Sequence, residues 1–170
     1  MPPNAELYKV LQRLETATAG LSPAQALGLI DEAIADSRNS DYRPHFEVHK
    51  AGVLRGAGQT QEAVLLLERC AAEYDYIDSM HCFAGEYLLE QGQFAQAVRY
   101  LNRCVEIAES SDDGWYHDSA LLLRAYCAAK LGKLDMARRD LAEIKDDDPM
   151  SWLSVEPIVS KSSIERMIQA

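Results

Sequence analysis

Gly58-Gln-Thr-Gln-Glu-Ala63 is repeated 34 residues later as Gly92-Gln-Phe-Ala-Gln-Ala97, and again as Gly132-Lys-Leu-Asp-Met-Ala137. Each phrase joins a glycine, which suits a turn, to a small residue early in the helix that follows. A period of about 34 residues with this pairing is typical of stacked helical hairpins. The three phrases therefore predict an all-α protein built from repeated helix–turn–helix units.

Around the phrases, we expect repeats over 41–75, 76–109 and 115–149. The first helix of the first repeat is predicted to take Asp41 as its N-cap and Pro44 in its first turn. Turn-forming residues between the second and third repeats predict a longer loop there. Pro149 is expected to end the last repeat, because the residue before a proline disfavours the helical region.

The N-terminal segment 4–38 is predicted to form a degenerate hairpin that lacks the phrase. Its apolar residues recur at helical spacing, and Gly20 is expected to end the first of two helices. Ser22 then suits an N-cap, with Pro23 in the first turn of the second helix.

The C-terminal segment 150–170 is predicted to cap the array. We expect an extended crossing at 155–159 and then a short helix that starts near Ser162. Its apolar residues Ile164, Met167 and Ile168 fall on one face. Terminal repeats need such a shield for the last hydrophobic face. With this cap, residues 1–170 are expected to form a single domain.

The chain has 170 residues and a net charge of −10. The acidic residues are spread along the chain, not gathered in a tail. A phosphate backbone would be repelled, so direct binding to nucleic acid is not expected. A basic protein partner would be attracted. The alternative is that the acidity only keeps the protein soluble.

The cysteines show neither a CxxC pair nor the dense spacing of a disulfide framework. Cys70 and Cys104 occupy equivalent places in two repeats, which favours packing between helices. Free thiols suit a reducing compartment, so we expect a cytoplasmic protein. No secretory signal is visible in residues 1–9, and the longest aliphatic stretch, 64–67, is too short to cross a membrane.

The phrases resemble the tetratricopeptide repeat. That family places a glycine at the turn, a small residue early in the second helix and a large residue four positions later. The matching residues are Gly58, Ala63 and Leu67, then Gly92, Ala97 and Leu101, then Gly132, Ala137 and Leu141, with Pro149 at the end. A further small residue lies seven positions before each turn glycine, at Ala51, Gly85 and Ala125. The tryptophan and tyrosine that the family carries in its first helices are missing here.

The resemblance implies a right-handed superhelical array of antiparallel hairpins, a TPR-like α-solenoid whose first helices line a concave groove. By that analogy the groove candidates for partner binding are His45, Val48, Gly52, Arg55, Cys82, Glu86, Leu89, Leu122, Tyr126 and Lys130. One subclass of the family grips the acidic tails of chaperones with lysine, asparagine and arginine. The corresponding positions here hold Val48, Gly52, Phe83, Ser119 and Leu123, so that function is disfavoured.

No catalytic, cofactor or metal site is predicted, and the protein is not expected to be an enzyme. His45-Phe-Glu47-Val-His49 places two histidines on one helix face, but Glu47 points away from that face and no third ligand is evident. His81 and His117 are expected to be isolated. The acidic runs 112–113 and 146–148 lack the alternating spacing of a calcium loop.

These features indicate a module that binds proteins. The preferred interpretation is an inhibitor of one partner, similar to the small bacterial repeat proteins that neutralise a toxin or effector. The alternatives are a class II chaperone of type III secretion, which would hold a secreted client, and a generic scaffold or adaptor. A homodimer through 1–38 or 150–170 is a further possibility. Trp115, Tyr116 and Trp152 could be exposed anchors for a partner, although packing is the favoured interpretation.

Overall fold

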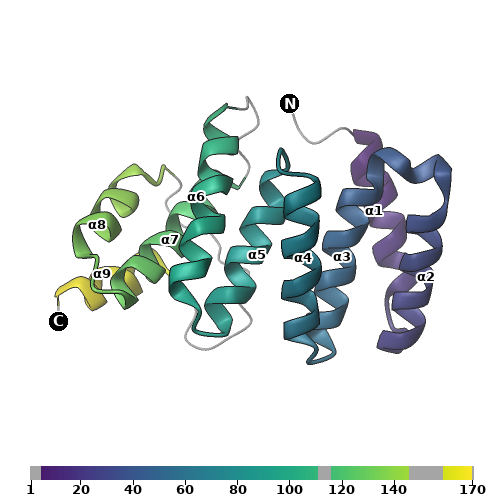
Figure 1. Cartoon of the computed structure of the whole chain (residues 1–170), viewed down its shortest axis with the longest axis horizontal. Coiled ribbons are helices and arrows are strands. Elements are labelled where there is room, and N and C mark those ends of the chain that lie inside the picture. Colours follow the sequence, from purple (N-terminus) through teal and green to yellow (C-terminus); the bar gives the residue numbers. More distant parts are fainter. Residues whose placement is uncertain (1–4, 111–115, 146–158, 170) are drawn as a thin grey trace. The chain divides into compact units, whose positions relative to one another are not determined.

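The computed structural model describes residues 5–110, 116–145 and 159–169, and every regular element in these ranges is a helix (Figure 1). Packing divides the chain into two compact units, Met1–Tyr74 and Asp75–Ala170. Each unit is built from helices that pack in chain order. The predicted all-α architecture of consecutive hairpins is therefore confirmed. The prediction of a single domain over 1–170 stays a prediction.

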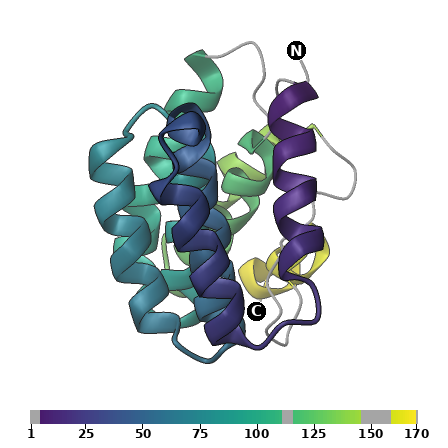
Figure 2. The same ribbon diagram turned by 90° about the vertical axis from the view of Figure 1, so that its right-hand side faces the viewer.

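The first unit contains two hairpins joined by a short 3₁₀ helix. Its elements are α1 (Ala5–Thr18), α2 (Pro23–Ala35), η1 (Ser37–Tyr42), α3 (Arg43–Gly56) and α4 (Thr60–Glu73). Helices α1 and α2 run antiparallel to each other (Figure 2). Helix α2 then packs on α3, and α3 on α4. Ile30, Phe46, Ala51 and Leu67 are buried in this unit.

Local signals in the sequence explain how the first hairpin is formed. Gly20 follows α1 with a φ of 75°, a conformation that glycine adopts without strain. Ser22 is the N-cap of α2: its side chain accepts a hydrogen bond from the backbone N–H of Gln25, and the Gln25 side chain accepts one from the backbone N–H of Ser22. The predicted cap at Ser22 is confirmed.

The predicted N-cap at Asp41 is wrong. Asp41 lies inside η1, and the N-cap position of α3 is Tyr42, which makes no side-chain capping bond. Asp36 caps η1 instead, by accepting a hydrogen bond from the backbone N–H of Arg38. Because the 3₁₀ helix comes first, α3 begins only at Arg43. Pro44 lies in the first turn of α3 as expected.

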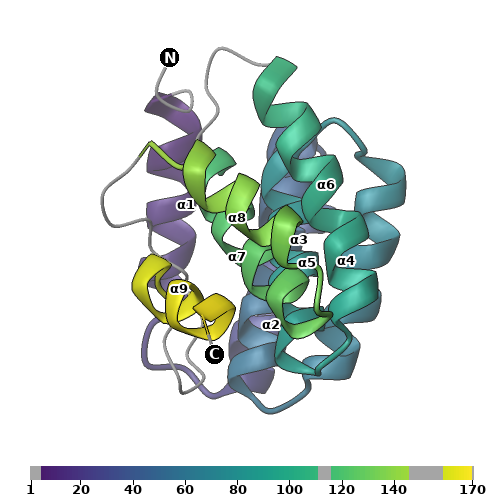
Figure 3. The same ribbon diagram turned by 90° about the vertical axis from the view of Figure 1, so that its left-hand side faces the viewer.

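The second unit contains two hairpins and a final helix. Its elements are α5 (Asp78–Glu90), α6 (Phe94–Ser110), α7 (His117–Lys130), α8 (Leu134–Glu143) and α9 (Lys161–Gln169). Each helix from α5 to α7 packs on the next one, and α5 also contacts α7. Helix α9 packs on both α7 and α8 (Figure 3). Its residue Ile164 is fully buried. The predicted capping helix is thus confirmed, while most of the expected crossing at 155–159 lies outside the described residues.

Three hairpin turns share one hydrogen-bond pattern. The N–H of Gly58 donates to the carbonyl of Arg55, and the N–H of Gln59 donates to that of Leu54, both at 2.9 Å. The same two bonds recur around Gly92 and Gly132. The three glycines have φ values of 80°, 73° and 71°, which completes a Schellman motif at the end of each first helix. In the part of the chain that is described, no helix is long and apolar enough to cross a membrane.

Candidate functional site

Two pairs of aromatic side chains lie on α5, α6 and α7 of the second unit. The ring of Phe83 on α5 meets that of Tyr116, just before α7, edge-on with 5.9 Å between centroids. The ring of Phe94, at the start of α6, meets that of Tyr126 on α7 in the same way at 6.3 Å. All four side chains are half-buried. They combine an anchored ring with accessible atoms, the combination found at binding hot spots.

Tyr126 is also contacted by a cation. The Nζ atom of Lys130 lies 5.3 Å from the centroid of the Tyr126 ring, within the range of a cation–π interaction. Lys130 is exposed at the last position of α7. Two of the groove candidates from the sequence therefore lie side by side, one with an aromatic ring and one with an exposed positive charge.

The other groove candidates differ in how much side chain they expose. His45, Val48 and Arg55 on α3 are half-buried, and Gly52 is exposed. Cys82, Glu86 and Leu89 on α5 are buried, and Leu122 on α7 is fully buried. The Cys82 thiol shares a hydrogen bond with Cys104 of α6, and this contact together with burial raises its pKa. The buried side chains serve core packing, and the role of the set in binding a partner stays a prediction.

A buried ion pair fixes the position of α7. The guanidinium of Arg124 donates two hydrogen bonds of 2.8 Å to the carboxylate of Asp140 on α8, and a third of 3.0 Å to Asn102 on α6. Asp140 is only 1% exposed. The sequence analysis missed this network, although a lone arginine inside the apolar run 120–129 is a signal that could have indicated it.

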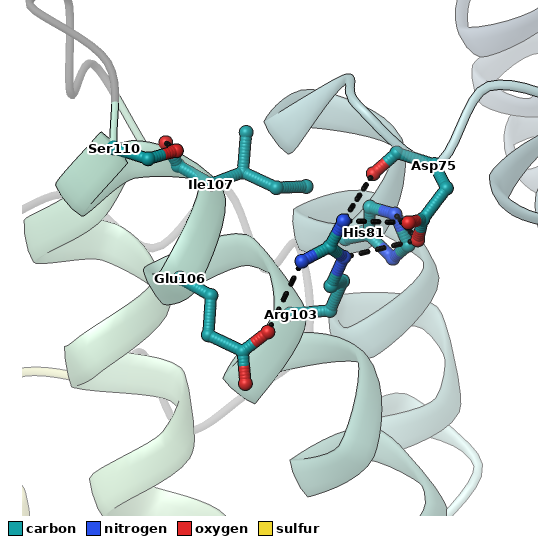
Figure 4. A network of polar contacts seen from close by, with 6 residues as sticks. All are labelled: Asp75, His81, Arg103, Glu106, Ile107 and Ser110. Atoms are coloured by element: carbon teal, nitrogen blue, oxygen red, sulfur yellow. Dashed lines mark hydrogen bonds and ion pairs between the residues drawn. The ribbon is translucent and has the colours of Figure 1, made fainter.

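A second polar network joins α6 to the segment before α5 (Figure 4). Arg103 donates to both carboxylate oxygens of Asp75 and to Glu106, and the hydrogen bond from Arg103 lowers the pKa of Asp75. The buried ring of His81 lies beside the same carboxylate, with its Nε2 atom 3.4 Å from Asp75 Oδ1. Burial nevertheless lowers the pKa of His81, because desolvation outweighs the nearby charge.

The histidine pair on α3 does not converge on a common ligand site. His49 Nε2 lies 3.2 Å from Thr18 Oγ1 of α1, and burial lowers the pKa of its ring. Glu47 is buried, with one carboxylate oxygen 3.9 Å from Arg43 Nε. His49 therefore links α3 to α1, whereas Glu47 pairs with Arg43 within α3.

His117 is not isolated, contrary to the expectation from the sequence. Its Nε2 atom lies 3.9 Å from Glu143 Oε1, and one ligand atom from each of Glu109, His117 and Glu143 falls within 4.8 Å of the other two. These three residues come from the ends of three different helices. The acidic runs 112–113 and 146–148, together with Trp115 and Trp152, lie outside the described residues. Tyr116 is half-buried, and burial raises the pKa of its hydroxyl.

The fold is a scaffold of helical hairpins, and comparison with known protein families identifies the kind of repeat. Residues 78–111 and 119–151 each match a family model of the tetratricopeptide repeat. These two segments of the chain are thus tetratricopeptide repeats, and such repeats are protein–protein interaction modules. The first predicted repeat, 41–75, corresponds to the α3–α4 hairpin of the structure.

Similar proteins agree with this assignment. Protein PHOX3 of Arabidopsis thaliana is 32% identical over 101 residues, which cover 59% of this chain and 11% of that protein. The aligned part of the chain therefore spans about a tenth of the length of that relative. Two crystal structures of nearly identical TPR-like repeats, described as a kinesin light chain of Podosopora anserina, have TM-scores of 0.60 and 0.62. They cover 82% and 85% of this chain and 72% and 75% of their own, at 18% identity, a likeness that shows the fold alone.

Proposed function

We propose that this protein binds one specific basic protein and sequesters or neutralises it, in the manner of an immunity protein that inhibits a toxin or effector. The observation that carries the proposal is the charge of the second unit. Residues 75–170 contain 10 lysines and arginines against 17 aspartates and glutamates, a net charge of −7. A surface of this sign steers a basic partner toward it and raises the rate of association.

The aromatic pairs supply the short-range part of the proposed interaction. Tyr126, with Lys130 beside it, and Phe83, with Tyr116 beside it, are held by their ring contacts and lose little conformational freedom on binding. Charge then brings the partner close, and burial of these rings holds it. The proposed function needs no catalysis, because sequestration is a matter of affinity and stoichiometry.

The proposal is tested with the full-length protein. Affinity capture from its own source supplies the partner, and calorimetry with the purified pair gives the dissociation constant at low and high salt. We expect one partner per chain and binding at least about tenfold weaker in high salt, because the Debye length falls from about 10 Å at 0.1 M to about 3 Å at 1 M. Binding that does not change with salt would overturn the electrostatic part.

A matched pair of variants tests the site. Tyr126→Ala should weaken binding by at least about tenfold, as expected of an aromatic hot spot. Leu65→Ala removes an exposed apolar side chain from α4, where Leu65 is 56% exposed, and should leave the affinity unchanged. Co-expression should also relieve the toxicity of the partner, and less so with Tyr126→Ala. A partner held through a short extended segment would instead indicate a secretion chaperone, and many weak partners a scaffold.

A further inference from the structure

We propose that Glu109, His117 and Glu143 form a binding site for a divalent transition-metal ion of the Zn²⁺ type. Glu109 lies in the last turn of α6, His117 is the first residue of α7, and Glu143 is the last residue of α8. The ligand atoms of the three side chains lie within 4.8 Å of one another. A site here would join the ends of three helices in the second unit.

The imidazole of His117 is already held in the orientation that a metal ligand needs. Its Nδ1 atom lies 3.0 Å from Asp118 Oδ1. Asp118 is held in turn, because its other carboxylate oxygen accepts a hydrogen bond of 3.0 Å from the backbone N–H of Lys145. Donation from Nδ1 to a carboxylate leaves the lone pair of the neutral ring on Nε2. Metal-binding histidines usually carry this carboxylate partner on the nitrogen that does not bind the metal.

The distances fit an ion placed between the side chains. His117 Nε2 and Glu143 Oε1 are 3.9 Å apart, too far for a hydrogen bond. Ligands at about 2.0–2.2 Å from a zinc ion lie at roughly 3–4 Å from each other. Glu109 and Glu143 are exposed, so small rotations of their side chains can close the remaining gap, whereas His117 is only 16% exposed and stays in place.

The local electrostatics also favour a cation. Two carboxylates converge at this point, and Glu109 and Glu143 lie at the C-terminal ends of α6 and α8, where the helix dipole is negative. An imidazole with two carboxylates suits Zn²⁺, Co²⁺ or Mn²⁺ better than Ca²⁺ or Mg²⁺, which prefer oxygen ligands alone. Three protein ligands leave at least one position for water or for a group from a binding partner.

The experiment is calorimetric titration of the full chain with zinc chloride. We expect one ion per chain with a micromolar dissociation constant. Glu143→Gln removes one ligand charge from an exposed side chain and should weaken binding by at least about tenfold, and His117→Gln should weaken it further. The matched control is His45→Gln, which removes a half-buried histidine of α3 and should not change the affinity.

Two further measurements separate this site from the cysteines and from misfolding. Co²⁺ should give visible absorption bands without a thiolate charge-transfer band, since no cysteine is a ligand. Zn²⁺ should raise the thermal midpoint of the wild type more than that of Glu143→Gln at the same Zn²⁺ concentration. The proposal is overturned if Zn²⁺ does not bind below millimolar concentration, if Glu143→Gln binds as well as the wild type, or if Co²⁺ shows thiolate charge transfer. In those cases His117 serves only as a contact between Asp118 and Glu143.

Discussion

At the scale of single residues, Gly85 decides how closely two helices approach. A Cβ atom built on Gly85 of α5 would lie 2.6 Å from Cγ and 2.7 Å from Cδ2 of Leu101 on α6. Leu101 is fully buried, and the clash falls on its Cγ atom near the backbone as well as on the end of its side chain. The small residue seven positions before the turn glycine is therefore a packing requirement of the α5–α6 hairpin.

Gly85→Ala is expected to destabilise the protein by about 1–3 kcal/mol, because the added methyl group overpacks a filled core. The control is Gly28→Ala in the interior of α2, where a Cβ meets no atom within 4 Å. That change should be neutral or stabilising by about 0.5–1 kcal/mol, because alanine favours helix over glycine. Urea denaturation of both variants measures the difference, and equal effects would contradict the packing argument.

A second prediction at this scale concerns the buried charge of Arg124. Asp140→Ala leaves the guanidinium of Arg124 without its carboxylate partner and should cost about 3–5 kcal/mol. The exposed pair Arg138–Asp135 on the same helix is the control, with Asp135 98% exposed. Asp135→Ala should change stability little, because exposed pairs contribute little. A small loss for Asp140→Ala would show that water or another group satisfies Arg124.

The buried thiols supply a third prediction at the scale of single residues. Burial raises the pKa of Cys70 to about 11 and that of Cys127 to about 12. Only the thiolate reacts, so both groups should label slowly with a disulfide reagent at about pH 8 in the native protein. All four cysteines should label quickly in urea. Fast labelling of the native protein would indicate that the core opens often.

At the scale of elements, the hairpin turns depend on backbone geometry more than on contacts. The glycines at 58, 92 and 132 all have positive φ, and a Cβ at any of them would meet no atom within 4 Å. The requirement for glycine therefore comes from conformation, since an L-residue in this region costs about 1–2 kcal/mol.

Gly58→Ala should accordingly destabilise the α3–α4 hairpin by about 1 kcal/mol. Two residues earlier, Gly56→Ala makes the same chemical change at the last helical position of α3, also in open space but without a positive φ. It should be neutral or slightly stabilising. Thermal unfolding of both variants tests the contrast, and a loss at Gly56 equal to that at Gly58 would contradict it.

At the scale of the whole molecule, stability should depend on pH through two histidines, the buried His81 and the half-buried His49. Burial lowers the pKa of His49 and His81 below the ordinary value of 6.5. Below pH 6.5 the unfolded chain binds protons at these rings while the folded chain does not. Their contribution to stability is therefore present above that pH and is lost as the pH falls through the lowered values.

His81→Gln should make stability less sensitive to acid, with the gap to the wild type narrowing as the pH falls from about 7 to about 5. The comparison with the wild type cancels the effect of the many exposed carboxylates, which both proteins share. Urea denaturation at several pH values gives the two curves. Parallel curves would show that the folded and unfolded states bind protons at His81 equally, which would contradict the lowered pKa.

Much of the fold could be predicted from the sequence because its determinants are local. The turn glycines, the small residues seven positions before them and the cap at Ser22 each act within one hairpin, and the structure has a hairpin turn at each of the three phrases. Asp41 failed as a predicted cap because an unforeseen 3₁₀ helix, itself capped by Asp36, comes before α3.

The sequence by itself determined the repeated hairpins, because a turn glycine and a small helix residue constrain backbone and packing within some 34 residues. The tertiary structure alone decided which side chains meet. It paired Arg124 with Asp140 and Asn102, buried Cys82 and Leu122 among the groove candidates, and brought His117 to Glu143. Such meetings depend on how packed helices rotate and cross, both within a hairpin and between hairpins, and the spacing of residues along the chain does not encode that geometry.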